Sequence, residues 1–287
     1  MSKTASSVEG YWIEQIGLMR ELPAAVTANE PESIHDLRAA GRRLKATIRV
    51  YRPLLRPQLA EALLAELDWY NSELGRARDA EVIHEHMAEL FADRADAKPL
   101  LDELAGEQES LRQEAITILG GDRAAALVDL AGVMVAQPWR RSKARKGKGP
   151  TREQIMHRVG WAEQRVGKAW QEVDAHPEGR WAGLHLLRRR AKAARYAYES
   201  VAAARSGAAA TARYYAELAD LLGMVQDAVI VERVLAGRPG ELTEYALDEQ
   251  RRRSQAAEKR VADARKSATA STADSGRLAT APAQPPV

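Results

Sequence analysis

Two segments of the sequence carry basic residues at a spacing that places their side chains on one face of an α-helix. Each segment begins with a histidine, and a basic residue follows at the third, seventh and tenth positions after it. At about 100° per residue, these positions fall within an arc of about 80°. The residues are His35, Arg38, Arg42 and Lys45 in the first segment, and His185, Arg188, Lys192 and Arg195 in the second. Because arginine binds phosphate oxygens through paired hydrogen bonds and lysine adds a point charge, each stripe predicts a polyanion site.

The recurrence of this stripe favours a ligand over the simpler explanations. A basic helix face is ordinarily a solvated surface, and a histidine at a helix start ordinarily caps or packs. Like charges on one face repel, however, and folding alone does not require them to be aligned twice. A ridge of this kind is about 15 Å long, which accommodates several consecutive phosphates, and two facing ridges would form a channel.

Each basic stripe has an apolar face behind it. In the first copy that face consists of Leu37, Ala40, Leu44, Ile48 and Tyr51, and Pro53 is expected to end the helix just after it. In the second copy it consists of Leu187, Ala194, Tyr198 and Val201, with Arg190 intruding on the apolar side. Fourteen residues after each histidine stand Arg49 and Glu199, so the second stripe is expected to be shorter.

A second repeated motif lies downstream of each stripe. Leu74-Gly75-x-x-x-Asp79-Ala80 recurs as Leu222-Gly223-x-x-x-Asp227-Ala228. The repeat unit is too long for a solenoid, which favours a duplicated helical bundle. The composition is rich in Ala, Leu, Arg and Glu and poor in aromatics (5%), and no alternating strand pattern is present. The sequence therefore predicts an all-α protein.

Composition along the chain also divides it into segments. Residues 1–8 are expected to be a flexible N-terminus, residues 9–138 the first bundle repeat and residues 139–150 a basic linker. A Thr-x-x-Gln capping box at Thr151 predicts the start of a helix and of the second repeat, 151–250. Residues 251–287 are charged and then rich in Ala, Ser and Thr, which predicts a disordered tail.

The overall composition restricts the kinds of chemistry. The chain has no cysteine, which excludes thiolate sites and fits a reducing cytoplasm. It has no apolar run of the signal-peptide or membrane-spanning kind, so a protein without a membrane partner is expected. The net charge is only +3, and the basic residues gather in two islands. The stretch from His35 to Arg56 contains seven Arg and Lys residues and one acidic residue, Asp36. The stretch from Arg180 to Arg205 also contains seven, with Glu199 as its one acidic residue. We expect no cofactor and no metal site.

These residues resemble the conserved histidine α-helical (CHAD) domain family, whose members bind inorganic polyphosphate. The similarity covers most of residues 10–235 and comprises four blocks in the family's order, which begin at His35, Leu74, His185 and Leu222. The resemblance implies two antiparallel four-helix bundles with pseudo-twofold symmetry around a basic central channel. It implicates the eight stripe residues in binding, with Arg43, Arg49, Arg78 and Arg189 in a second rank; Gln226 stands opposite Arg78 in the other repeat.

Further basic residues at the same spacing flank the second stripe. Arg158, Arg165 and Lys168 lie at relative positions 0, 7 and 10 beside Trp161, and we include Arg158 and Arg165 in the second rank. The Glu-x-Glu-x-Lys motif of triphosphate tunnel enzymes and the Walker phosphate loop are both missing from the sequence. We therefore expect non-catalytic binding, with association with cytoplasmic polyphosphate granules as one biological use and protein partners unassigned.

Two other functions are compatible with parts of the pattern. Glu32-x-x-His35 and Glu81-x-x-His84 fit the carboxylate-histidine spacing of di-metal helical bundles, although the cationic array after His35 would repel a metal ion. A nucleic acid could also follow a basic groove. Single-strand binders interleave exposed aromatics with their cations, however, and the stripes carry none.

Overall fold

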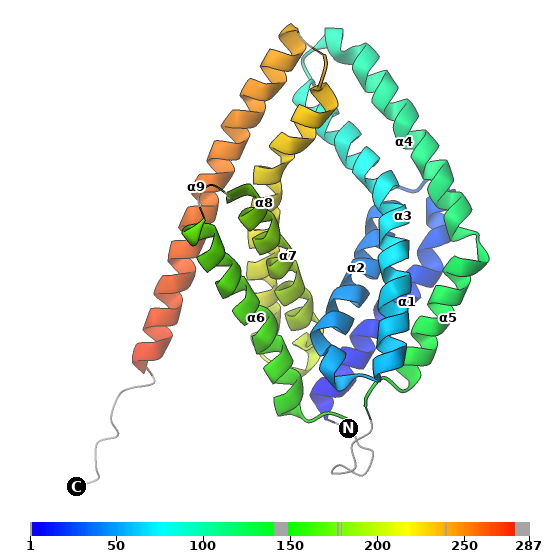
Figure 1. Cartoon of the computed structure of the whole chain (residues 1–287), viewed down its shortest axis with the longest axis vertical. Helices are drawn as coiled ribbons and strands as arrows, with labels where there is room; N and C mark the ends of the chain where they lie inside the picture. The colour runs from blue at the N-terminus through cyan, green and yellow to red at the C-terminus, as the bar shows by residue number, and fades with distance from the viewer. Residues whose placement is uncertain (1, 141–148, 177, 179, 239, 279–287) are drawn as a thin grey trace. The chain divides into compact units, whose positions relative to one another are not determined.

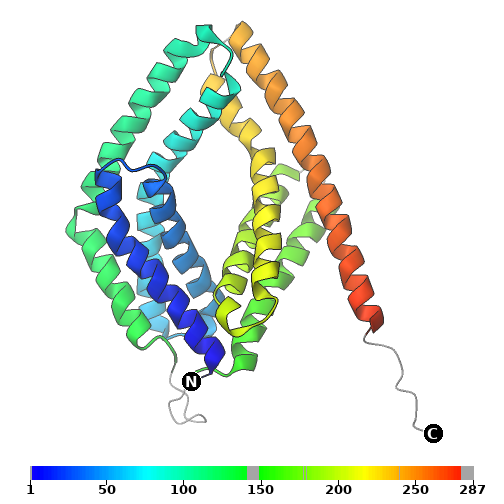
Figure 2. The same cartoon turned by 180° about the vertical axis from the view of Figure 1, so that it is seen from behind.

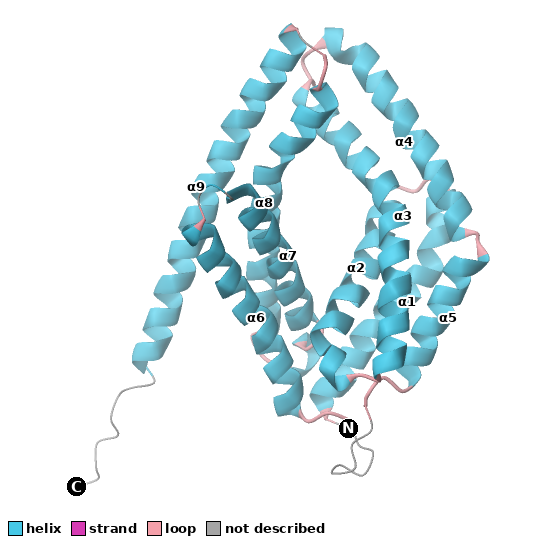
Figure 3. Cartoon of the chain, viewed as in Figure 1, coloured by secondary structure: helices cyan, strands magenta, loops and turns pink. Residues whose placement is uncertain are grey.

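The computed structural model of the 287-residue chain describes residues 2–140, 149–176, 178, 180–238 and 240–278, without the side chains of 226–230, 264 and 266–278. Within these ranges every regular element is helical, as Figure 3 shows, and the one β-bridge, Leu55 with Trp139, is isolated. The predicted all-α class is confirmed. No helix in the described ranges has the length and apolarity needed to cross a membrane.

The chain divides into two compact units, Met1–Ala216 and Glu217–Val287. Unit 1 contains α1 (Lys3–Thr27), α2 (Ser33–Tyr51), α3 (Pro57–Leu90), α4 (Lys98–Leu119), α5 (Asp122–Ala136), α6 (Arg152–Ala175) and α7 (Arg180–Glu199). It also contains the short 3-10 helices η1 (Arg52–Leu54), η2 (Ala95–Ala97) and η5 (Ala202–Ala204). The helix α8 (Ala208–Leu235) begins in unit 1 and ends in unit 2, which also contains α9 (Glu241–Leu278).

The two stripe helices have the apolar faces that the sequence predicts. In α2 the five predicted core residues, Leu37, Ala40, Leu44, Ile48 and Tyr51, are all completely buried. The corresponding residues of the second copy are also buried: Leu187, Ala194 and Tyr198 in α7, and Val201 just after it. Burial of one face leaves the other for the basic side chains, so the hydrophobic pattern determines the orientation of both stripes.

The helix boundaries follow local signals in the sequence. The helix α2 ends at Tyr51 and continues as η1 because Pro53 cannot extend the α-helical hydrogen bonding. Thr151 and Gln154 form the predicted capping box at the start of α6, each side chain accepting a hydrogen bond from the other residue's backbone N–H. These two signals place α2 and α6 as the sequence predicts.

The helix α2 lies at the centre of unit 1, where it packs against α1, α3, α6 and α7 (Figure 1). Seen from behind, α1 runs alongside α2 on the near side (Figure 2). The indole N–H of Trp12 in α1 donates to the Thr47 hydroxyl at 2.9 Å, and the Trp12 ring meets Tyr51 edge-on at 6.0 Å. The Tyr51 hydroxyl in turn lies 2.9 Å from that of Ser200, just after α7. A buried polar chain therefore connects α1, α2 and α7.

The structure differs from the expected segments at both ends of the chain. The helix α1 includes most of the segment 1–8 that we expected to be flexible, because Ser2 caps it by accepting from the Ala5 N–H and Val8 is fully buried. The expected tail, 251–287, is helical to Leu278, and residues 279–287 lie outside the described part. Pairing of Arg253 with Glu249 at 3.0 Å, together with a high alanine content, stabilises this helix.

The internal division also differs from the one expected. The compact units meet within α8 rather than in the segment 139–150, whose residues 141–148 lie outside the described part. Trp139 belongs to unit 1 because its indole donates to Glu9 and its backbone pairs with Leu55. The two repeats, 9–138 and 151–250, and the pseudo-twofold symmetry between them stay predictions.

We expect the hydrogen bond between Trp12 of α1 and Thr47 of α2 to stabilise the fold. Replacing Thr47 with Val leaves the buried indole N–H without its acceptor, and we expect the free energy of unfolding to fall by about 1–3 kcal/mol. Urea titration followed by circular dichroism measures this change. The control Thr117→Val removes a hydroxyl that is exposed on α4 and donates to the Gln113 carbonyl, and it should cost less than about 0.5 kcal/mol. Equal losses would show that the contact does not support the fold.

Candidate anion-binding site

A cleft with a volume of about 220 Å³ lies between α2, α6 and α7, and we call it the first basic cleft. Its floor is apolar and is formed by Ala46, Val50, Ala162 and Ala193, while Trp161 and Tyr196 add aromatic surface. Its basic lining residues come from all three helices: Arg42, Lys45 and Arg49 from α2, Arg165 from α6, and Arg189, Arg190 and Lys192 from α7. The cleft thus joins cations from both repeats of the stripe.

The lining of the first basic cleft contains seven cationic residues and no carboxylate. Asp68 of α3 is a counter-charge beside the cleft, where it pairs with Lys45 and lies 2.9 Å from the Arg49 guanidinium. Partial burial acts to raise the pKa of Asp68, but Lys45 and Arg49 outweigh it and lower the pKa below its ordinary value. Asp68 therefore stays ionised and neutralises part of the positive charge on one side of the cleft.

Arg42 is a partly buried cation of the cleft. Its Nε atom is buried and has no hydrogen-bond partner among the described residues. Burial lowers the pKa of Arg42, and the nearby cations Arg38, Arg188 and Arg43 lower it further, while Tyr196 acts in the opposite direction. Because Arg38 and Arg188 belong to different stripes, Arg42 lies where the two stripes approach one another. The guanidinium stays charged, so the arrangement costs free energy that an anion would recover.

The α6 side of the cleft is organised around Trp161. The guanidinium carbons of Arg158 and Arg165 lie 4.1 and 4.8 Å from the centre of its ring, within the range of cation–π attraction. Arg158 also donates from Nε to the Val50 carbonyl at 2.7 Å, which ties α6 to α2. Burial lowers the pKa of both Arg158 and Arg190, and Arg165 lowers them further. Three arginines therefore share one positive environment.

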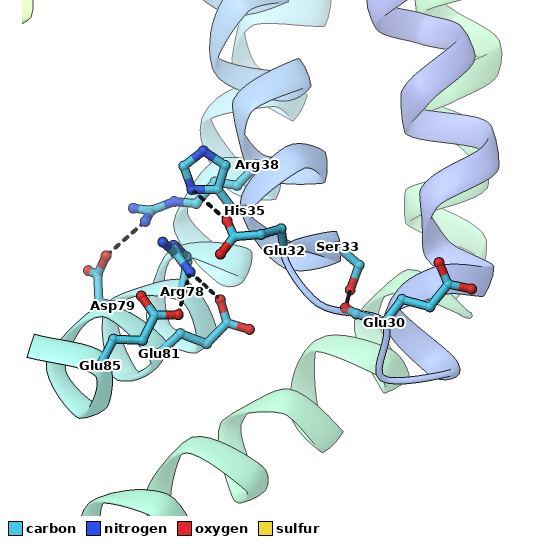
Figure 4. A network of polar contacts seen from close by, with 9 residues as sticks. All are labelled: Glu30, Glu32, Ser33, His35, Arg38, Arg78, Asp79, Glu81 and Glu85. Atoms are coloured by element: carbon cyan, nitrogen blue, oxygen red, sulfur yellow. Dashed lines mark hydrogen bonds and ion pairs between the residues drawn. The ribbon is translucent and has the colours of Figure 1, made fainter. Parts of the chain in front are cut away.

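The Arg38 side chain does not line the first basic cleft and points toward α3. Its Nη1 donates to the Asp79 carboxylate at 2.8 Å, as Figure 4 shows. A Cβ atom at position 75 would lie only 3.1 Å from the Arg38 guanidinium, so Gly75 makes room for this side chain. The repeated Leu-Gly-x-x-x-Asp motif therefore positions a stripe arginine in the first copy. The side chain of Asp227, in the second copy, lies outside the described residues.

The His35 end of the first stripe is surrounded by carboxylates (Figure 4). Arg78 donates to Glu81 at 2.9 Å and to Glu85 at 3.4 Å, and His35 lies 3.8 Å from Glu32. Burial lowers the pKa of His35 and Arg78 lowers it further, so the imidazole is mainly neutral at pH 7. Arg78, which we expected in the second rank of binding residues, is instead held in an acidic network.

The two histidines differ in their position along the helix. His35 lies in the first turn of α2, which begins at Ser33, as expected. His185 is exposed and lies more than one turn after the start of α7 at Arg180, so the expected location at a helix N-terminus is wrong for the second copy. The effect of a helix N-terminus on an anion acts within the first turn, so only His35 is placed to share it.

The structure brings six of the predicted residues together in the first basic cleft: Arg42, Lys45, Arg49, Arg165, Arg189 and Lys192. The others lie elsewhere, and Arg43 and Arg195 both contact Glu199 on a different face of the two helices. Arg190 also lines the cleft, although its place on the helical wheel had suggested an intrusion into the core. Its position in the run Arg188-Arg189-Arg190 was the signal that could have identified it.

The residues of the di-metal alternative are not arranged as a metal site. Glu81 is hydrogen bonded to Arg78, and no group of three His, Asp or Glu residues in the described ranges is arranged to hold a metal ion. Glu81 and Glu85, near His35, pair instead with the guanidinium of Arg78. The expectation of no metal site stays a prediction.

The sequence was also compared with known families and structures. The family model described as CHAD domain matches residues 11–236. The chain belongs to the CHAD domain family. Two solved structures resemble this CHAD domain closely in fold. The first, PptA from Streptomyces chartreusis, has a TM-score of 0.72 at 20% identity, covering 92% of this chain and 100% of that one.

The second structure is the CHAD domain from the plant Ricinus communis. Its TM-score is 0.66 at 21% identity, and the match covers 86% of this chain and 85% of that one. At these identities the two structures support the fold of the CHAD domain alone. Among curated proteins there is no match.

The position of Arg42 among other cations predicts that this residue lowers stability while it favours anion binding. Arg42→Met removes a half-buried cation from among other cations, and we expect the free energy of unfolding at low salt to rise by about 1 kcal/mol. In the control, Arg78→Met, Glu81 and Glu85 lose their cation, and stability should fall by about 1–3 kcal/mol. Chemical denaturation of the two variants checks this contrast, and a loss of stability in both would contradict it.

Proposed function

We propose that this CHAD domain binds inorganic polyphosphate without catalysis, in the first basic cleft. The observation that carries the proposal is the cationic lining of that cleft, in which seven Arg and Lys side chains face a shared space that no acidic residue lines. Polyphosphate offers a linear series of anionic oxygens at short spacing, and arginine forks match them with paired hydrogen bonds. Family membership, together with the sequence resemblance described above, supports polyphosphate as the polyanion.

The proposed polyphosphate chain also extends beyond the first basic cleft. It passes from Arg42 toward Arg38 and His35 of α2, and along Lys192, Arg188 and His185 of α7. The electrostatic influence of Arg38 and Arg188 on Arg42 supports this course because it places cations of both stripes near one point. In this proposal the two stripes form the walls of a channel, and phosphate raises the lowered pKa of His35 so that the imidazole becomes charged in the complex.

The proposed biological setting follows from the ligand. A protein that holds polyphosphate without cutting it would associate with polyphosphate granules in the cytoplasm. Binding without catalysis also predicts that the chain length of bound polyphosphate stays constant over time. Gel electrophoresis of polyphosphate incubated with the protein measures this length.

Nucleic acid is the alternative ligand, and the aromatic ring of Trp161 in the cleft is the feature that could favour it. Trp161 lines the first basic cleft, where an exposed aromatic ring would stack on a base. Arg158 and Arg165 already lie over that ring, and the predicted core residues Tyr51 and Tyr198 are buried. The aromatic surface is therefore engaged by the protein, which favours a ligand without bases.

A competition assay at one fixed salt concentration tests the proposal. Unlabelled polyphosphate should displace fluorescent long-chain polyphosphate from the protein at lower phosphate concentrations than RNA or DNA does. Charge reversal in the cleft, Arg42→Glu with Lys192→Glu, should weaken binding by at least about 100-fold and make the salt dependence shallower, because two phosphate contacts are lost.

A charge-matched control separates the cleft from the net charge of the protein. Arg56→Glu with Arg152→Glu reverses two exposed arginines at helix starts outside the cleft, where an acidic residue is compatible with the helix dipole. This control should weaken binding much less than the cleft variant. Equal weakening by both pairs, or stronger displacement by nucleic acid, would overturn the proposal.

A further inference from the structure

Unit 1 contains a second basic cleft, with a volume of about 440 Å³, between α1, α2, α7 and the start of α8. Its basic residues are Arg43, Arg195 and Arg213, and Glu14 and Glu199 also line it. Arg43 follows Arg42 of the first basic cleft directly, so the two clefts adjoin on different faces of α2. Unlike the first, the second basic cleft contains its own carboxylates.

Glu199 is held in the second basic cleft as a bound anion would be. The Tyr11 hydroxyl donates to Glu199 Oε2 at 2.7 Å, Arg195 Nε donates to Oε1 at 2.7 Å, and Arg43 Nε lies 3.9 Å from Oε2. Burial raises the pKa of Tyr11 and Glu199 raises it further, so the phenol remains a donor at physiological pH. Two guanidinium groups and a hydroxyl are also the donors that bind phosphate oxygens.

The carboxylate of Glu199 does not satisfy this set of donors fully. Arg43 Nε is buried and makes no hydrogen bond within the described ranges, because 3.9 Å is too long for one. The side chains of Arg43, Arg195 and Glu199 are 29%, 25% and 22% exposed, so solvent and a ligand reach all three. A larger anion with more oxygens would therefore fit these donors better than one carboxylate does.

We propose that Glu199 is an internal counter-ion that occupies a phosphate subsite formed by Tyr11, Arg43 and Arg195, and thereby excludes polyphosphate from the second basic cleft. This inference rests on the proposed function and adds a specificity-determining residue to it. Removing the charge of Glu199 opens the second basic cleft to the continuation of a bound chain. A long polyphosphate gains from this opening, whereas a short one that ends within the first basic cleft does not.

The variant Glu199→Gln tests the proposal because the amide oxygen preserves the shape and an acceptor for Tyr11. We expect the affinity for long-chain polyphosphate to rise by about fivefold or more, with a salt dependence steeper by about 1–2 in log–log slope from the added phosphate contacts. The affinity for tripolyphosphate should change by less than about twofold. Adding Arg43→Gln to Glu199→Gln should abolish the gain for long chains.

The control Glu163→Gln removes the same charge from a carboxylate in a similar setting. Glu163 accepts hydrogen bonds from the hydroxyls of Tyr198 and Tyr215, at 2.8 and 3.1 Å, and lines neither basic cleft. This variant should leave the preference for long over short chains unchanged. If Glu199→Gln loses helicity, Glu14→Gln on the same cleft provides the second test, with an expected gain of about twofold for long chains.

The outcomes separate this inference from the proposed function. A wild-type protein that binds no polyphosphate overturns both. Wild-type binding with no gain in Glu199→Gln, with equal gains for short and long chains, or with the same gain in Glu163→Gln overturns the role of Glu199 alone.

Discussion

The packing of α2 against α7 brings basic side chains of both helices close together, and contacts in the rest of unit 1 must offset their repulsion. Arg42 is half-buried beside arginines of both helices, and no carboxylate lines its cleft. Repulsion within this group opposes folding, so contacts on the opposite faces of the helices must outweigh it. Tyr51, completely buried and bonded to the Ser200 hydroxyl, is one such contact, and Trp12 supports it from α1. A hydrophobic core thus maintains a positive surface that is poised for an anion.

Carboxylates on α3 and α7 pair with some of the basic residues of this region and leave others without an acidic neighbour in the cleft lining. Asp79 and Glu81 on α3 engage Arg38 and Arg78 at the histidine end of α2, and Asp68 engages Lys45 and Arg49 at the other end. Glu199 engages Arg195 and Arg43 on the side that faces α1. What remains without a carboxylate in its lining is the first basic cleft. In the proposed function, the distribution of acidic residues therefore matters as much as that of the basic ones for where a polyanion binds.

The sequence predicts what depends on periodicity and on local signals. The apolar face of α2, the end of that helix before Pro53 and the capping box at Thr151 all follow from residues that are near one another in the chain. The all-α class follows from composition and helical spacing, and the family follows from the resemblance of four sequence blocks to its members. Glu199 was identified as the residue that shortens the second stripe, because it stands where the first copy has Arg49.

The sequence does not predict which charges meet across the fold. The pairing of Arg38 with Asp79 joins residues 41 positions apart, and that of Arg43 with Glu199 joins two different helices. The resemblance implied a second-rank binding role for Arg78, but the orientation of α3 places it among carboxylates. The N-terminal segment was expected to be flexible because it is short and polar, whereas Ser2 and Val8 are held by contacts that only the folded chain provides.

The most direct test of the central claim is a crystal structure of the full chain bound to a short, defined polyphosphate. We predict phosphate groups in the first basic cleft, with oxygens at about 3 Å from the guanidinium of Arg42 and from basic side chains of α7. Phosphate density confined to other surfaces, with the first basic cleft empty at saturating ligand, would contradict the account.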